Sequence, residues 1–469
     1  MMRVYPLTLS VHAGEELKLC VEPGHRFRVA FYRYWLSDEA QLTAAPEFSQ
    51  TCGVEQGNDI FQSPSRPWYG KPDREWEWPW ISYRLNSSDW PSGVYAALVY
   101  EVDDLGIPTD EIGRSAVAGS TLGFLSSNAA MFVVTPRSPT ASIAYIVPIA
   151  TYHAYNFTGG GCFYEYREPP AAPCRTVTLR RPGCGIGGVS REALDPYDKA
   201  SPRQAFTHWD AKMIGWMRRE GFAVDCFTDL DLDQKKFLVD ISANTPLYRL
   251  VISAGHHEYW SETMRDRIQG LLNVGGNFAT FSGNTCYRKI SFDAAGMSVT
   301  KENECWPDSN EARLLGVSYS QGGGWWGVRD GGQWRQTERP AIGYTVAAPQ
   351  HWVFADVKLP QDGIFGAAER LIGYECDGIV PNVSPENVIV LAKALLQGGW
   401  NNGDGHTSSM VTFGSGQGTV FNAATTDWAR VLADPATESY DAVSQITRNI
   451  LEKLSGLKGG GNRGTHVAE

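Results

Sequence analysis

The stretch YRLVISAGHHEYWSETMRDRIQGLLNVGGNFATFSGNTCYRKI, residues 248–290, decides the fold. It begins with a short apolar, β-branched run at Leu250–Ala254, which is typical of a buried parallel strand. Four apolar residues then recur at the spacing of one helix face: Met264, Ile268, Leu271 and Leu272. Ser261 is placed to cap this helix, and a second strand is predicted over Phe278–Phe281.

A strand, helix and strand of these lengths predict a parallel pair joined by a right-handed crossover. The polar segments that follow the two strands, which contain Glu258 and Asn284, then leave the sheet at the same edge. Open α/β sheets bind ligands at this carboxyl edge. We therefore expect Glu258 and Asn284 to be neighbours in a site.

Length, charge and composition narrow the class of protein. A chain of 469 residues predicts at least two domains, and a net charge of −11 argues against nucleic acid or a membrane as partner. The first residues lack the apolar run of a secretory signal, and the nine cysteines include no C-x-x-C pair. We therefore expect a cytoplasmic protein with reduced thiols. The 16 Trp and 49 Gly fit a hydrolase or a sugar-binding protein equally well.

Hydrophobic periodicity divides the chain into two domains. Residues 1–136 alternate apolar and polar side chains between Gly and Pro, which predicts an all-β sandwich of immunoglobulin-like type. Residues 136–140 have the composition of a linker. From residue 141 to 457 the pattern changes to alternating strands and helices, which predicts an α/β domain. Residues 458–469 are expected to form a disordered tail.

A tyrosine-rich segment follows the first α/β strand and should also leave the carboxyl edge. It contains four tyrosines separated by glycines: Tyr152, Tyr155, Tyr164 and Tyr166. On composition alone, packing at the rim of a loop is the favoured interpretation. The alternative is that phenolate oxygens act as hard ligands, as a tyrosinate does for iron in catalase.

Several familiar catalytic motifs are absent. His256 and His257 directly precede Glu258, but no histidine follows it at the spacing of a zinc H-E-x-x-H helix. No G-x-S-x-G nucleophile elbow occurs, and the strand that ends at Ala254 delivers no thiol. A loose cluster of cysteines at Cys162, Cys174 and Cys184 leaves a zinc or disulfide role open.

Taken together, these segments resemble the family of the large (beta) subunit of N,N-dimethylformamidase. The order and spacing of the matching pieces are more specific than any one of them. The matching stretches are Tyr152–Asn156, Gly159–Tyr164, Arg181–Pro182, Trp216–Asp229, Gly255–Ser261, Phe281–Tyr287, Gly373–Asp377 and Val420–Trp428. Before them, Trp90–Tyr95 resembles the end of the family's β-domain.

The resemblance implies a glutamine-amidotransferase-like, flavodoxin-like parallel sheet without a cysteine nucleophile. It also implies a mononuclear iron, expected as Fe³⁺, held by two tyrosines and a glutamate. Carried over to this sequence, the metal ligands are Glu258, Tyr155 from the pair Tyr152/Tyr155, and Tyr164 from the pair Tyr164/Tyr166.

The same resemblance implies that Asn284 and Glu375 assist amide hydrolysis. In this mechanism Glu375 transfers a proton and Asn284 donates to the developing oxyanion. His256 is the third catalytic candidate, and Tyr259 and Tyr287 are expected to support the ligands.

We therefore expect a metal-dependent amidohydrolase that acts on a small or peptide-like amide, as a homo-oligomer and with a possible small partner subunit. The chain departs from the family at Leu179–Pro182 and in the long loop Pro169–Ser201, which argues against dimethylformamide itself as substrate. Two alternatives stay open. One is an iron-tyrosinate enzyme with redox or rearrangement chemistry on a natural-product intermediate, and the other is a non-enzymatic glycan-binding protein.

Overall fold

The structure, a computed structural model, describes most of the chain. The described residues are 3–22, 26–33, 55–56, 71–85, 90–110, 113–114, 129–156, 158, 161–164, 174–183, 206–303, 305–325, 328–330, 333–335, 339–396, 399–401 and 405–457. Within these ranges no helix combines the length and the apolar character that crossing a membrane requires. The predicted tail at 458–469 lies outside them.

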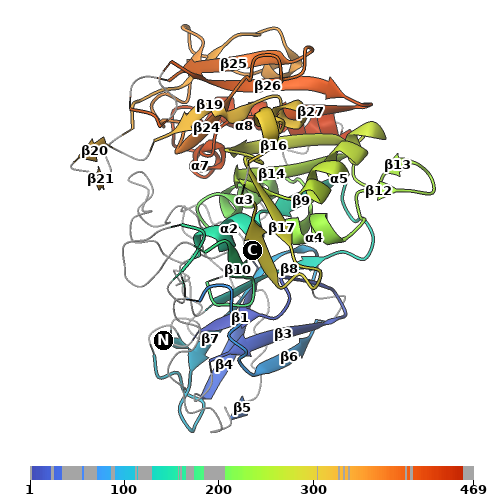
Figure 1. Cartoon of the computed structure of the whole chain (residues 1–469), viewed down its shortest axis with the longest axis vertical. Coiled ribbons are helices and arrows are strands. Elements are labelled where there is room, and N and C mark those ends of the chain that lie inside the picture. Colours follow the sequence, from blue (N-terminus) through green and yellow to red (C-terminus); the bar gives the residue numbers. More distant parts are fainter. Residues whose placement is uncertain are drawn as a thin grey trace, which may run out of the picture.

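A nine-stranded mixed sheet forms the centre of the molecule (Figure 1). Five neighbouring strands are parallel, in the order β11 (Asp225–Thr228), β9 (Ile143–Val147), β14 (Leu250–His256), β16 (Asn277–Gly283) and β27 (Gly418–Asn422). Antiparallel strands extend the sheet, in the order β26 (Thr407–Ser415), β25 (Ile389–Leu395), β22 (Tyr344–Val346) and β23 (Ile364–Phe365). The direction of winding changes between β9 and β14, and such a switch point opens a crevice at the carboxyl edge.

The predicted strand–helix–strand unit is confirmed. Strands β14 and β16 pair in parallel from Leu250 opposite Asn277 to His256 opposite Gly283. The helix between them, α5 (Glu262–Asn273), begins after Ser261, whose hydroxyl accepts a hydrogen bond from the Met264 backbone N–H at 3.1 Å. All four residues of the predicted apolar face are buried.

Helices cover both faces of the parallel strands. On one face of the sheet, α5 and α4 (Asp229–Gln234) pack against strand side chains such as Val251 and Phe278. On the other, Leu250 and Ile252 contribute to the core that includes three helices: α3 (Asp210–Arg219), α7 (Trp428–Leu432) and α8 (Tyr440–Ser455). Because both faces are covered, these strands are buried almost throughout, as expected for parallel sheets.

The N-terminal part forms two small sheets. One is antiparallel and contains β1 (Val4–Pro6), β3 (Glu16–Val21) and β6 (Trp80–Arg84). The other has the order β2 (Ser10–His12), β8 (Ala129–Thr135), β7 (Gly93–Glu101), β4 (Arg26–Arg33) and β5 (Glu55–Gln56). A shared apolar core, which includes Leu17, Leu19, Phe31 and Phe132, joins the two sheets. Small N-terminal sheets are therefore present, whereas an all-β sandwich of immunoglobulin-like type stays a prediction.

The N-terminal sheets do not stand apart from the α/β part (Figure 1). The second face of strands β7 and β8, including Leu98 and Met131, belongs to the same apolar core as Ile143 and Trp209. Hydrogen bonds also cross the junction, for example from the Cys226 backbone N–H to the Ser92 hydroxyl at 2.8 Å. The predicted division at 136–140 thus lies between two parts that pack on one another.

Two further sheets lie at the carboxyl edge. One contains β10 (Thr176–Thr178), β18 (Ser298–Lys301), β17 (Arg288–Phe292) and β15 (Tyr259–Trp260), and the other contains β19 (Ser318–Gly324) and β24 (Glu375–Gly378). The remaining elements are α2 (Ile149–Tyr155), α6 (Ala312–Leu315), β12 (Val239–Asp240), β13 (Thr245–Pro246), β20 (Val328–Asp330), β21 (Gln333–Arg335) and short 3₁₀ turns at Pro307–Ser309 and Trp352–Phe354.

Two local expectations were wrong. The segment with Tyr152 and Tyr155 is the buried helix α2 and not a loop, because Ile149, Ala150 and Ala154 supply small and apolar side chains that pack into the core. The apolar residues that lead into Glu375 and the glycine at 378 predict that it stands at the end of a strand. It instead begins strand β24, which pairs with β19 outside the main sheet.

Candidate functional site

The site lies where β9 and β14 end, beside the switch point of the sheet. Helix α2 follows β9 directly and carries Tyr155, and β14 ends at His256, two residues before Glu258. The Thr151 hydroxyl of α2 accepts a hydrogen bond from the Glu258 backbone N–H at 3.1 Å. The sheet thus delivers side chains from two strand ends into one small volume.

Three oxygen-bearing side chains converge there. The Tyr155 hydroxyl donates to Glu258 Oε2 at 2.7 Å, and the Tyr164 hydroxyl lies 3.3 Å from Glu258 Oε1. The two hydroxyls are 3.1 Å apart, and the rings stack with centroids 4.6 Å apart. The Tyr164 hydroxyl also bonds to that of Tyr259. The structure therefore brings together all three residues predicted as metal ligands.

Burial shapes the electrostatics of this cluster. Glu258 is 2% exposed, and burial raises its pKa, a shift that the nearby Glu375 carboxylate reinforces. Burial also raises the pKa of Tyr155 and of Tyr164 well above the usual value, and the charge on Glu258 raises both further. Ionised phenols would thus be costly here unless a cation compensated them.

The alternative tyrosines of each pair fall elsewhere. The Tyr152 hydroxyl donates to Asp210 of helix α3 and not to the Glu258 carboxylate. Tyr166 lies outside the described residues. Of the two tyrosines on α2, it is therefore Tyr155 whose hydroxyl contacts Glu258 in the described part of the chain.

A second group of side chains adjoins the first. His256 Nε2 lies 2.8 Å from Glu375 Oε2 and 3.4 Å from Glu258 Oε2, and Asn284 Nδ2 donates to Glu375 Oε2 at 3.2 Å. Burial by itself would lower the pKa of His256, but the carboxylates of Glu375 and Glu258 outweigh it and the pKa is raised. All three predicted catalytic residues therefore meet, with the His256 imidazole between two carboxylates.

The position of Asn284 is fixed by its backbone. Its N–H donates to Asp377 Oδ1 at 2.8 Å, and its φ of 52° lies in the left-handed region that Asn tolerates better than most residues. A Cβ on Gly283 would lie 2.4 Å from the Glu375 carbonyl oxygen, so only glycine allows this approach of β16 to β24. The Asn284 side-chain oxygen is buried and has no hydrogen-bond partner among the residues that the structure describes.

His257 faces away from the site, as adjacent residues of an extended segment should. Its ring lies 4.7 Å from that of Trp260, and burial lowers its pKa to about 3. It is a neutral core residue and not a ligand.

Sequence reasoning missed Arg288 and Thr151. The Arg288 guanidinium Nε lies 3.6 Å from Glu258 Oε1, and its charge belongs to the site. Thr151 holds the backbone of Glu258 and Tyr259. The sequence could have indicated Thr151, because it stands one turn before Tyr155 on α2. The position of Arg288 beside the site depends instead on the pairing of β15 with β17.

The oxygens of Tyr155, Tyr164 and Glu258 fit a small hard cation. Such ions bind oxygen at about 2.0–2.1 Å, so that two of their ligand oxygens lie about 2.8–3.4 Å apart. The separations of 3.1 and 3.3 Å fall within this range, and that of 2.7 Å is 0.1 Å below it. No group of three His, Cys, Asp or Glu side chains in the described part of the chain could hold a metal, so the phenols are needed for any such site there.

The Gly- and Cys-rich loop is described only over 174–183. There Arg181 is fully buried and donates to the carbonyls of Gly161 at 2.8 Å and His153 at 3.0 Å, which fixes the segment leading to Tyr164. Cys162 and Cys174 are free thiols, and Cys184 lies outside the described residues.

Most of the chain matches one known protein family. Residues 54–442 match the family described as N,N-dimethylformamidase beta subunit-like, C-terminal. The chain belongs to this family. The match spans the tyrosine helix, Glu258, Asn284 and Glu375, so the whole site lies within the family's characteristic region. A comparison with curated proteins returned no match.

Solved structures with partial similarity include two cytoplasmic proteins of Salmonella typhimurium. STM3548 has a TM-score of 0.29 and 13% sequence identity, and the match covers 52% of this chain and 85% of STM3548. STM1381 has a TM-score of 0.31 and 12% sequence identity, and the match covers 52% of this chain and 86% of STM1381. A thua-like protein of Parabacteroides merdae has a TM-score of 0.25 and 15% sequence identity, and the match covers 53% of this chain and 84% of that protein. Scores this low support no inference about this chain.

Proposed function

We propose that the protein hydrolyses a carbon–nitrogen bond of a small or peptide-like amide, with a mononuclear ferric ion held by Tyr155, Tyr164 and Glu258. The observation that carries this proposal is the convergence of two phenol oxygens and the Glu258 carboxylate, with contacts of 2.7–3.3 Å, in a family named for an amidase subunit. Two phenolates and one carboxylate would supply three negative charges, which suits a hard trivalent ion. The parallel strand order, second, first, third, fourth and fifth along the chain, is that of flavodoxin-like sheets and supports the glutamine-amidotransferase-like fold.

When bound, the ion would polarise the substrate carbonyl and lower the pKa of water. The remaining work falls to the chain. Glu375 would accept the proton of the attacking water, and His256, hydrogen-bonded to it at 2.8 Å, would stabilise the charged carboxylate and return a proton to the leaving amine.

Asn284 would orient the substrate. Its Nδ2 is engaged by Glu375, which leaves the unpaired side-chain oxygen to accept the N–H of the scissile amide. This differs from the oxyanion role expected from the resemblance, because the group left free is an acceptor and not a donor. The small partner subunit and the homo-oligomeric state stay predictions.

Amine release tests the function. Purified chain incubated with a panel of primary and secondary amides should release amine, and Glu258→Gln should reduce kcat/KM by at least about 10³-fold, the order seen when an electrostatic group that acts on the transition state is removed. Glu262→Gln is the matched control, because Glu262 is an exposed carboxylate paired with Lys289 outside the site. Full activity in Glu258→Gln, or oxidised products without free amine, would contradict an amidase.

A further inference from the structure

Two cations stand beside the tyrosine–glutamate cluster. In the described chain one of them contacts a single carboxylate, that of Glu258, and the other forms no ion pair with a carboxylate. They are Arg288 on β17 and Lys301 on β18. In these antiparallel strands Lys301 is opposite Ile290, so Arg288, two residues earlier, is its diagonal neighbour on the same face. Long side chains at diagonal positions of a strand pair can converge on one ligand.

Lys301 is the less satisfied of the two. Its ammonium donates to the Phe163 carbonyl at 3.2 Å and lies 5.3 Å from the centre of the Tyr164 ring. It forms no ion pair with a carboxylate in the described chain, although it is partly buried. A partly buried ammonium that contacts only a carbonyl oxygen and an aromatic face has no counter-ion among these neighbours. It can therefore bind an anion.

Arg288 is held loosely. Its Nε lies 3.6 Å from Glu258 Oε1, the longest contact of that carboxylate, and its Nη1 donates to the Cys305 thiol at 3.0 Å. Its side chain remains 40% exposed. Tyr164 and Tyr287, the neighbouring aromatic residues, are also only partly buried.

We propose that Arg288 and Lys301 form the binding site for an anionic group of the substrate, and that the preferred substrate is an amide bearing a carboxylate close to the scissile bond. Arg288 would offer its planar fork of N–H donors to the carboxylate, and Lys301 a point charge. Neutral amides such as dialkylformamides would leave both cations unmatched.

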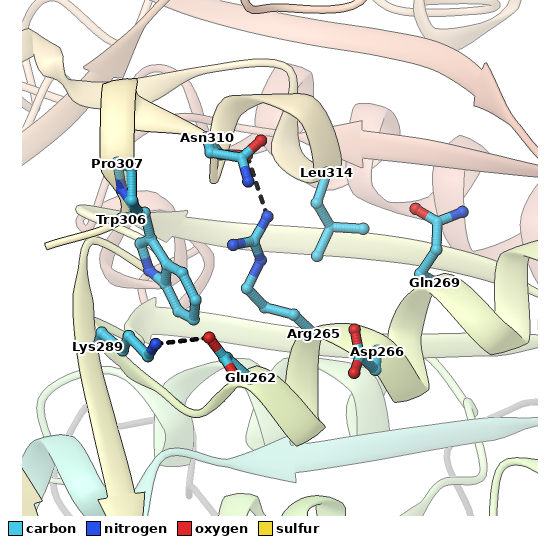
Figure 2. Close-up of a pocket in the computed structure, with 9 residues that line it drawn as sticks. All are labelled: Glu262, Arg265, Asp266, Gln269, Lys289, Trp306, Pro307, Asn310 and Leu314. Atoms are coloured by element: carbon cyan, nitrogen blue, oxygen red, sulfur yellow. Dashed lines mark hydrogen bonds and ion pairs between the residues drawn. The ribbon is translucent and has the colours of Figure 1, made fainter.

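Strand β17 provides a built-in control. Lys289 follows Arg288 and points to the opposite side, where it pairs with Glu262 at 2.5 Å and lies 5.6 Å from the centre of the Trp306 ring. Figure 2 shows Lys289 in this separate cavity of about 490 Å³, together with Arg265 and Trp306. Lys289→Gln thus removes a positive charge from the same strand without touching the proposed anion site.

The reaction part of this inference depends on the proposed function, but the binding part does not. The test is calorimetric titration of the purified full chain with N-acetylglycine and with N-ethylacetamide, which differ in the carboxylate. Wild-type protein should bind N-acetylglycine at least about tenfold more tightly. Lys301→Gln should abolish this preference without changing the affinity for N-ethylacetamide, Lys301→Arg should restore it, and Lys289→Gln should leave it intact.

Equal binding of the two compounds by wild-type protein would overturn the proposal, as would an equal loss of both in Lys301→Gln, which would indicate only that Lys301 positions Tyr164. Amine release measured in parallel separates the two proposals. Binding that depends on Lys301 but without hydrolysis would remove the amidase function alone. Hydrolysis that favours neutral amides would remove the anion site alone.

Discussion

Helix α2 contributes to two clusters of the same chemical composition, each with two tyrosines and one carboxylate. In one cluster Tyr145 and Tyr152 both donate to Asp210, the former at 2.7 Å. In the other cluster Tyr155 and Tyr164 converge on Glu258.

Their surroundings differ. The Asp210 cluster is sealed in the core, with all three side chains at most 1% exposed and both phenols satisfied by the carboxylate. The Glu258 cluster opens past the partly buried Tyr164 and borders charged groups on two sides. Composition alone therefore does not make a metal site; an open face and neighbouring proton carriers are also needed. We assign a structural role to the first cluster and a functional role to the second.

The largest effect should come from Glu375, which belongs to the functional side without being a metal ligand. Glu375→Gln should lower kcat for amine release by about 10²–10⁴-fold, the usual contribution of a positioned general base. Iron content should remain that of the wild type, because the three proposed ligands are untouched. Steady-state kinetics with metal analysis of the same preparation checks this, and loss of iron would place Glu375 among the ligands.

On the structural side, Asp210→Ala should destabilise the protein by about 2–5 kcal/mol, because two buried phenol hydroxyls lose their acceptor. Chemical denaturation measures the loss. The iron content of the folded protein should not change. A variant of normal stability that had lost its iron would reverse the roles of the two clusters.

The pH dependence of stability offers a finer comparison. Burial raises the pKa of Asp210 to about 7, so the folded protein keeps a proton that the unfolded chain releases at lower pH. Stability should therefore fall as pH rises from about 4 to about 7 and then level off. Between pH 5 and pH 8 the wild type should lose about 2–3 kcal/mol more than Asp210→Asn. Parallel pH profiles of the two proteins would refute the raised pKa.

The sequence predicted the elements that depend on local periodicity. The unit β14–α5–β16 was predicted correctly because its apolar residues, its cap at Ser261 and its glycines agree with one another. Helix α2 was missed because its tyrosines and the glycines after it have the composition of a loop, whereas tertiary burial makes this short segment helical.

Long-range pairings limited the prediction of the site. Glu375 reaches Asn284 only because β24 leaves the main sheet and pairs with β19, and no periodicity in 371–378 indicates this. The family resemblance, not the pattern, brought Glu375 into the site. Arg288 and Lys301 were overlooked because their proximity depends on the register of β17 and β18.

The central claim is that Tyr155, and not Tyr152, binds iron together with Tyr164 and Glu258. The most direct test is elemental analysis and the visible absorption spectrum of purified wild-type protein, Tyr155→Phe and Tyr152→Phe, since ferric phenolates absorb visible light. We predict about one iron per chain and a visible band in the wild type and in Tyr152→Phe, and loss of both in Tyr155→Phe. A colourless, iron-free wild-type protein, or a band that survives in Tyr155→Phe, would contradict the claim.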